Sequence, residues 1–224
     1  MHQDKIFVTV NSKLMSLATF MKMDRFAATD VWVDNCPGLA ALPDLPAATF
    51  VRVDNCPGLA VLPDLPAAKV VWINNCPGLA ALPDLPAATN VRVNNCPGLA
   101  ALPTLPAATV VRVADCPGLA ELPDLPAATF VRVNNCPGLA LVEGGMDSRG
   151  YNFFGVKLRG QWRICAGCRT LSLTDARRHW GDGGASDRKD CLRLVEKIAD
   201  EIGRRDRSSG AEQQKPTQSP PNFF

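Results

Sequence analysis

Four residues of the types that bind zinc, three cysteines and one histidine, lie in the C-terminal part of the sequence. Cys165 and Cys168 form a Cys-x-x-Cys pair, and His179 and Cys191 follow it. Thiolate sulfur and imidazole nitrogen are the usual ligands of structural zinc. The later spacings match no familiar zinc finger, and the cysteine pair ends an apolar strand pattern. The sequence therefore favours buried structural cysteines, keeps these four residues as candidate metal ligands, and predicts no cofactor.

Catalytic chemistry has weaker signals. Cys168 could act as a nucleophile and His179 as its base, but the sequence indicates no third residue that would orient the base. The glycine-rich stretch 181–184 lacks the lysine and the following helix of a phosphate-binding loop. We therefore predict that the protein is not an enzyme.

The C-terminal part also carries a modest excess of basic residues. Residues 143–207 contain fourteen arginines and lysines against ten acidic residues, with Tyr151 and Trp162 among them. Such a mixture can bind nucleic acid. Because the acids are interleaved with the bases, we expect a solvated surface instead. Zinc or nucleic-acid binding by a C-terminal module, with the rest of the chain as a spacer, is kept as the alternative function.

A repeating segment precedes these residues and takes up half of the chain. CPGLA occurs six times at intervals of twenty residues, and LPxLPAA occurs five times between its copies. A fixed period of this length indicates a solenoid, in which similar units stack on one another.

Each repeat predicts one short strand, a turn and an extended return. In the second copy, Val51 and Val53 are β-branched and have strand spacing, so they face one side while Arg52 faces the other. A Pro-Gly pair then ends the strand, and two further prolines favour extended or polyproline backbone. No part of the repeat has helical periodicity. One unit cannot bury enough apolar surface to fold alone, so stacking must stabilise it.

The pattern V-x-V-x-N-C-P-x-L-x-x-L-P-x-L-P resembles the leucine-rich repeat over residues 26–142. Its LPxLP half is similar to the short repeats of secreted bacterial effectors, and its cysteine-containing half is similar to repeats of plant resistance proteins. The resemblance implies an α/β repeat solenoid with a parallel sheet on a concave face and extended segments on the other. Some similar effectors carry a ubiquitin-ligase domain, for which this chain has no room, so we do not carry that activity over.

Variation between the copies is concentrated at the outward positions of the strands. The central position reads Trp, Arg, Trp, Arg, Arg, Arg along the stack. Arginine and aromatic residues are enriched at interface hot spots, and these neighbours are spaced for cation–π contact. We expect them to bind a protein partner; the alternative is that they only make the sheet face soluble. The candidate partner-binding residues are Trp32, Phe50, Arg52, Trp72, Arg92, Arg112, Phe130 and Arg132.

Two nearly constant positions after each strand are predicted to be structural. The first is asparagine, replaced once by Asp115, and we expect its side chain to point inward and bond the turn backbone. The second is cysteine in all six copies, which we expect to form a ladder of buried thiols. Reduced thiols indicate a cytoplasmic protein, with a secreted effector as the alternative. No apolar run is long enough for a membrane span.

The segments outside the repeats are predicted to cover the ends of the solenoid. Residues 1–25 are expected to form an N-terminal cap, with a strand at 5–10 and a short helix at 12–23. Residues 204–224 are polar and are expected to form a disordered tail.

Residues 150–203 are predicted to form a small α+β module of two strands and two helices, docked on the last repeat. We expect a hairpin of 151–158 and 161–166, then a helix capped by Thr174 and a second helix capped by Ser186 or Asp187. The module resembles an uncharacterised one found on bacterial and phage repeat proteins. Together, the sequence predicts a monomeric, non-enzymatic scaffold that binds a protein partner through the concave sheet face.

Overall fold

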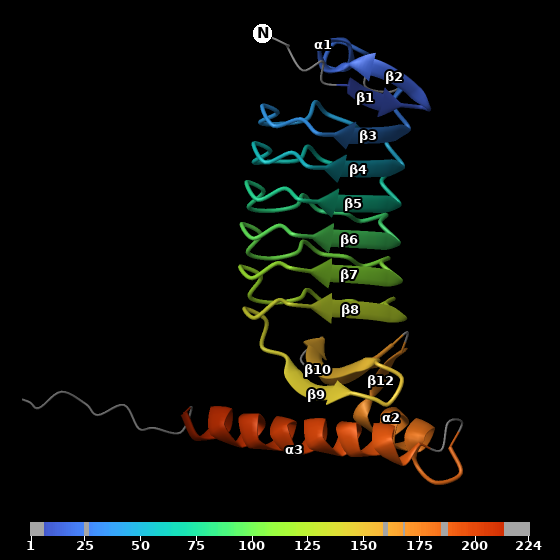
Figure 1. Ribbon diagram of the computed structural model, residues 1–224, viewed down its shortest axis with the longest axis vertical. Helices are drawn as coiled ribbons and strands as arrows, with labels where there is room; N and C mark the ends of the chain where they lie inside the picture. Colours follow the sequence, from blue (N-terminus) through green and yellow to red (C-terminus); the bar gives the residue numbers. More distant parts are fainter. Residues whose placement is uncertain (1–6, 25–26, 159–160, 168, 185–187, 213–224) are drawn as a thin grey trace, which may run out of the picture.

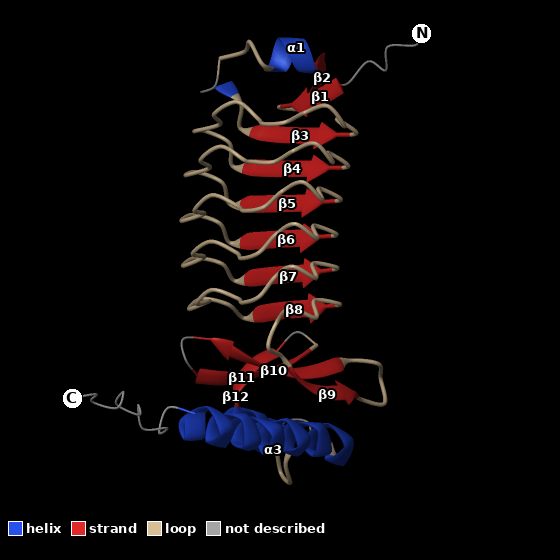
Figure 2. Ribbon diagram, turned by 90° about the vertical axis from the view of Figure 1, so that its left-hand side faces the viewer, coloured by secondary structure: helices blue, strands red, loops and turns tan. Residues whose placement is uncertain are grey.

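The computed structural model describes residues 7–24, 27–158, 161–167, 169–184 and 188–212. Figure 1 shows the repeats as a column of coils, with a small N-terminal unit at one end and a sheet with helices at the other. In both Figure 1 and Figure 2 the coils follow a nearly straight line. The sheet face is therefore flat along the stack, and the concave face that we expected is not formed. No helix among the described residues has the length and apolarity to cross a bilayer.

The repeating part is a β-solenoid built on one parallel sheet. Each coil contributes one strand, paired in register with the strand twenty residues further on, so Arg52 lies beside Trp72 and Val53 beside Ile73. Extended return segments, drawn as loops in Figure 2, complete each coil. The described helices all lie outside the repeats, so the repeats are β-class rather than α/β. The six strands are β3 (Asp30–Asp34), β4 (Phe50–Asp54), β5 (Val70–Asn74), β6 (Asn90–Asn94), β7 (Val110–Ala114) and β8 (Phe130–Asn134).

The core runs through the inside of the column. In the second coil Val51, Val53, Cys56 and Leu59 are fully buried, and their equivalents in the other coils are also buried. The strand alternation therefore directs one face inward, as its period of two predicts. The repeat cysteines are free thiols, and their Sγ atoms donate to the carbonyl two residues earlier, as Cys56 does to Asp54 O at 3.2 Å. Burial raises the pKa of the first of them, Cys36, to about 12.

The asparagine after each strand differs from the prediction. Its side chain does not enter the core; Asn55 and Asn95 are exposed. The backbone at this position is left-handed in every coil, with φ of 52° at Asn75, a conformation that asparagine tolerates better than most residues. The side-chain amides also bond one another along the stack: Nδ2 of Asn75 donates to Oδ1 of Asn55, and Nδ2 of Asn95 donates to Oδ1 of Asn75, both at 2.8 Å.

The glycine of each CPGLA segment allows neighbouring coils to approach closely. A Cβ atom added to Gly98 would lie 2.6 Å from the carbonyl oxygen of Pro77 in the preceding coil. Such a distance is too short for two atoms that are not bonded. The equivalent Gly38 in the first coil has no coil before it, and an added Cβ there meets nothing within 4 Å. Stacking, more than the turn itself, therefore requires glycine here.

The N-terminal unit extends the sheet with two antiparallel strands. β1 (Phe7–Val10) pairs with both β3 and β2 (Lys13–Ser16), and α1 (Leu17–Phe20) follows. Of the strand that we predicted at 5–10, residues 7–10 form β1, and residues 5 and 6 lie outside the described residues. The predicted helix at 12–23 is instead a strand and a helix of four residues, because residues 13–16 pair with β1.

The C-terminal unit is a second sheet with two helices. The sheet has the strand order β12-β11-β10-β9, and β10 and β11 form the predicted hairpin. Two strands, β9 and β12, were missed by the sequence reasoning. The first helix is capped by Ser172 rather than Thr174, and the second continues to Glu212 through part of the predicted tail. The elements are β9 (Val142–Met146), β10 (Asn152–Leu158), β11 (Gln161–Ala166), β12 (Arg169–Ser172), α2 (Leu173–Trp180) and α3 (Lys189–Glu212).

Alternate residues of this second sheet face two different cores. Phe154 and Cys165 are buried in the core that continues from the repeats. Their neighbours Phe153 and Ile164 point to the opposite face and are buried in a second core that includes residues of α2 and α3. One face of the sheet therefore covers the last coil, and the other is covered by the helices, as Figure 1 shows with α3 below the sheet.

Substitution of Gly98 by alanine is expected to destabilise the protein by about 1–3 kcal/mol, because the added methyl group must force two coils apart. Gly38→Ala makes the same chemical change where there is no preceding coil, so its free energy of unfolding should stay within about 0.5 kcal/mol of the parent. Urea unfolding followed by circular dichroism measures both. Equal losses in the two variants would show that the turn, and not the stacking, requires glycine.

Candidate functional site

The candidate partner-binding residues lie together on the outer face of the parallel sheet. The strand register makes the six central residues direct neighbours in sequence order, from Trp32 beside Arg52 to Arg112 beside Arg132. Phe50 and Phe130 occupy the position two residues before them on their strands. We call this row of six residues the arginine–tryptophan ladder. The members are Trp32, Arg52, Trp72, Arg92, Arg112 and Arg132.

Aromatic rings and guanidinium groups alternate in the first four rungs. The guanidinium carbon of Arg52 lies 4.4 Å from the ring centroid of Trp32, and that of Arg92 lies 5.1 Å from the ring centroid of Trp72. Phe50 meets Trp72 edge-on, with ring centroids 5.4 Å apart. These contacts hold the large side chains in defined positions, because a cation is attracted to the face of a ring. A preorganised surface loses less entropy on binding.

Acidic and polar residues accompany the ladder at its N-terminal end. Asp54 accepts hydrogen bonds from Arg52 Nε and from Asn74 Nδ2. Asp30 and Asp34 lie on the outer face of β3 beside Trp32. The charge of Arg52 is therefore compensated within the protein. Asp54 is buried and Arg52 is partly exposed, so the pair fixes the orientation of both side chains.

Three arginines follow one another at the C-terminal end of the ladder. Arg92, Arg112 and Arg132 lie on adjacent strands, and the residues two positions after them are Asn94, Ala114 and Asn134. No ion pair joins these arginines to an acid among the described residues. Burial and the neighbouring charges of Arg92 and Arg132 lower the pKa of Arg112. The ladder therefore ends in a concentration of positive charge that the protein does not neutralise.

Three polar atoms in or beside the ladder are covered but have no partner. Trp72 Nε1, Arg92 Nε and Asn90 Oδ1 make no hydrogen bond and are almost inaccessible to solvent. Buried polar atoms in folded proteins usually have a partner. These three atoms lie on the adjacent strands β5 and β6, at the centre of the face. The centre of the ladder is thus the place where hydrogen-bonding capacity is unused.

The candidate zinc ligands are only partly placed and do not form one group. Cys165 points into the core of the repeats, and burial raises its pKa to about 12. Cys191 lies in the second core, on the other face of the sheet. His179 is on α2, with its ring 4.9 Å from that of Trp180. Cys168 lies outside the described residues. Because a sheet separates Cys165 from Cys191, these two cysteines cannot bind one ion together.

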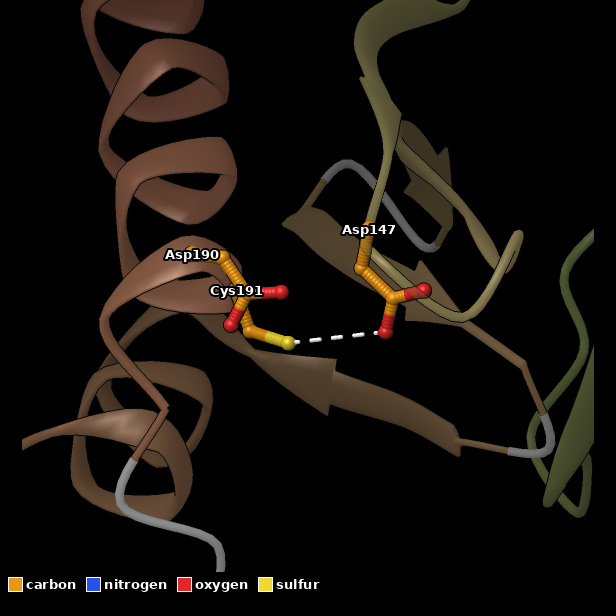
Figure 3. Close-up of side chains that lie close together, drawn as sticks. All are labelled: Asp147, Asp190 and Cys191. Atoms are coloured by element: carbon orange, nitrogen blue, oxygen red, sulfur yellow. Dashed lines mark hydrogen bonds between the residues drawn. The ribbon is translucent and has the colours of Figure 1, made fainter.

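A different cluster of potential ligands, which the sequence reasoning missed, forms around Cys191. Figure 3 shows Asp147 opposite Asp190 and Cys191, with the thiol directed at the Asp147 carboxylate. Ligand atoms of the three residues lie within 4.8 Å of one another. The two segments are far apart in the sequence, so no local motif indicates the cluster.

Protein donors already occupy both carboxylates of this cluster. Asp147 is buried and accepts bonds from the backbone N–H groups of Arg149 and Tyr151, from the Arg149 guanidinium, and from the Cys191 thiol. Asp190 is bonded by Arg188 and by Ser148. The two arginines neutralise the two acids. The cluster therefore joins the turn after β9 to the start of α3, and it carries no observation that points to a metal.

Comparison of the chain with protein-family models, with curated proteins and with solved structures finds no match.

Asp147→Asn is expected to lower the free energy of unfolding by about 1.5–3 kcal/mol at neutral pH, because it removes charge-assisted hydrogen bonds. Burial alone would raise the pKa of Asp147, but the bonds from Tyr151 and Arg149 outweigh it and lower the pKa below the usual value of an aspartate. A carboxylate with a lowered pKa in the folded state stabilises the fold above its unfolded pKa, and this contribution disappears as the pH falls through the folded pKa. The difference between the two proteins should therefore shrink below about pH 4.

Urea unfolding at several pH values measures this difference. Asp182→Asn is the matched control, since Asp182 is exposed and makes no ion pair among the described residues. A pH-independent difference for Asp147→Asn, or an equal effect of the control, would contradict the role given to Asp147.

Proposed function

We propose that this protein is a non-enzymatic scaffold that binds a protein partner through the outer face of its parallel sheet. The observation that supports the proposal is the arginine–tryptophan ladder itself. The ladder is continuous over six strands and lies on the solvent side, on the face of the repeat where the variation between copies is concentrated. A face needed only for solubility has no requirement for two tryptophans, of which Trp32 is 42% exposed.

The chemistry of the ladder suggests a partner with two kinds of residue. Near Trp32 and Trp72, flat aromatic surface favours apolar side chains of the partner. Near Arg112 and Arg132, uncompensated positive charge favours acidic side chains, because guanidinium groups bind carboxylates in a bidentate geometry. We therefore infer that the partner presents apolar residues followed by a group of aspartates or glutamates.

We extend the proposal to the class and setting of the protein. The coils match the leucine-rich-repeat pattern in their VxVxNC strand and LPxLP return, and we propose that they are a short variant of that repeat. Free, buried thiols in every coil are compatible with a reducing compartment, so we propose that the protein acts in the cytoplasm, with a secreted effector as the alternative. We also propose that it acts as a monomer.

Loss of the aromatic and cationic anchors should abolish partner capture. In Trp32→Ala/Trp72→Ala/Arg92→Ala, we expect at least a tenfold loss, because each anchor at the centre of an interface contributes on the order of 2 kcal/mol. The measurement is capture of a partner from lysate of the native host by the immobilised full chain, followed by quantitative mass spectrometry. The matched control is Asp44→Ala/Asp64→Ala/Asp84→Ala, which changes three exposed residues of the return segments. Undiminished capture by the ladder variant, with unchanged circular dichroism, would refute the proposal.

Capture should also depend on salt, because arginine–carboxylate contacts at an accessible face are screened by ions. We expect Arg112→Gln/Arg132→Gln to bind the same partner more weakly and with a smaller dependence on sodium chloride concentration. Biolayer interferometry with the identified partner at several salt concentrations measures both quantities. An identical salt dependence of the parent and the variant would exclude these two arginines from the interface.

A further inference from the structure

A cavity lies at the junction between the last coil and the C-terminal sheet. Its volume is about 840 Å³, within the range of sites that enclose small organic ligands. One wall is the outer side of β8, and the others come from the C-terminal unit, which lies below β8 in Figure 1. The residues that matter for its chemistry are Phe130, Arg132, Arg149, Tyr151, Arg169 and His179.

The charges that line this cavity are mainly positive. Arg149 is held by two bonds to Asp147, so that pair is neutral. Arg132 and Arg169 make no ion pair among the described residues. Glu143 is the one acid among the described lining residues. The cavity thus has two unpaired guanidinium groups and one carboxylate, so its net charge is positive. A concave wall strengthens the electrostatic potential of such charges inside the cavity.

The arginine–tryptophan ladder adds to this charge. Arg132 is both the last rung of the ladder and part of the cavity wall, and its neighbour Arg112 already has a lowered pKa because of burial and the adjacent arginines. At the other side of the cavity, burial and the charge of Arg169 lower the pKa of His179. Both lowered pKa values indicate a positive electrostatic potential, which a bound anion would reduce.

The uncharged part of the wall is aromatic. Phe130 lies under the guanidinium of Arg112 at 4.5 Å, and the guanidinium of Arg149 lies 4.9 Å from the ring of Tyr151. Trp180 and Phe153, whose rings are 5.0 Å apart, also line the cavity. These contacts fix the aromatic groups in place. The cavity therefore combines rigid apolar surface with guanidinium groups that have no acidic partner, which is the composition of a site for an organic ligand that carries negative charge.

We propose that this cavity binds a small organic anion, whose phosphate or carboxylate groups are held by Arg132 and Arg169 while its carbon skeleton contacts Phe130 and Tyr151. Guanidinium groups bind both kinds of anion through paired N–H donors. The volume is far larger than a single inorganic ion needs, so the ligand is organic. This site adjoins the proposed protein interface and shares Arg132 and Phe130 with it, whereas Arg169, Tyr151 and His179 belong to the cavity alone.

The test uses the full-length protein with ADP, citrate and inorganic pyrophosphate as probes. His179 is one of two histidines in the chain, so its imidazole signals can be followed by NMR and assigned with a His179→Gln variant. We expect ADP or citrate to raise the pKa of His179, since a nearby anion favours the imidazolium form. In Arg169→Gln, the affinity for that probe, measured by calorimetry, should fall about tenfold or more.

Arg193→Gln is the matched control, because it removes the same charge from an exposed position of α3 that does not line the cavity. Its affinity should equal that of the parent, and so should that of Trp32→Ala, which changes only the protein-binding face. Three results would overturn the proposal: no effect of ADP or citrate on His179, equal weakening in Arg169→Gln and Arg193→Gln, or binding of pyrophosphate alone. A variant that loses partner capture but keeps anion binding would test only the proposed protein interface and would leave the anion site supported.

Discussion

Parallel, in-register hydrogen bonding between successive coils is the constraint on which the rest of this structure depends. It places every side chain beside its equivalent twenty residues away, at the spacing of adjacent strands, about 4.8 Å. At the positions that hold the stack together, a recurring residue type must pack well against itself or bond to itself. Valine, leucine and cysteine do so in the core. Glycine does so where backbones approach closely, and asparagine does so because its amide has both a donor and an acceptor.

The same register applies on the outer face, but there identical neighbours are unfavourable. Arginine beside arginine is repulsive, and tryptophan beside tryptophan would be a large apolar stripe. In the first four rungs the alternation of the two avoids both problems, since each guanidinium group lies against a ring. The last three rungs have no such alternation. The composition of the face is therefore not explained by the requirements of stacking, which is why we attribute it to binding.

Much of the fold could be predicted because the repeat presents the same signal six times. The period indicated the stacking, and the Val-x-Val step indicated the strands and the inward side chains. The orientation of the repeat asparagines could not be predicted in the same way. Their side chains were expected to bond buried backbone groups, whereas the backbone at Asn75 and its equivalents is left-handed and the amides of Asn55, Asn75 and Asn95 bond one another along the stack. The position of the candidate ladder was predicted from the sequence. Its contacts with Asp54 and Phe50 could be identified only once the register of the strands was known.

Features outside the repeats were harder to predict because they depend on distant partners. β9 contains Gly144 and Gly145, which disfavour an isolated strand, and it forms because β10 offers an edge for pairing. β12 forms against β11 for the same reason. The cluster of Asp147, Asp190 and Cys191 joins segments more than forty residues apart, and each of these residues alone has an ordinary sequence context. Such contacts carry no periodic or local pattern.

The single aspartate in the asparagine ladder divides the column. Asp115 accepts a bond from Asn135 at 2.7 Å, but a carboxylate has no hydrogen to donate to Asn95, and the described residues show no side-chain bond between them. The amide series therefore runs from coil two to coil four, stops, and starts again between coils five and six. Among the described coils, the amide bond is missing at this joint and at the joint between coils one and two, where Asn35 donates to Asp34 instead. Under mechanical tension or thermal fluctuation, we expect the column to open first at these two joints, so that the last two coils and the C-terminal unit separate as one block.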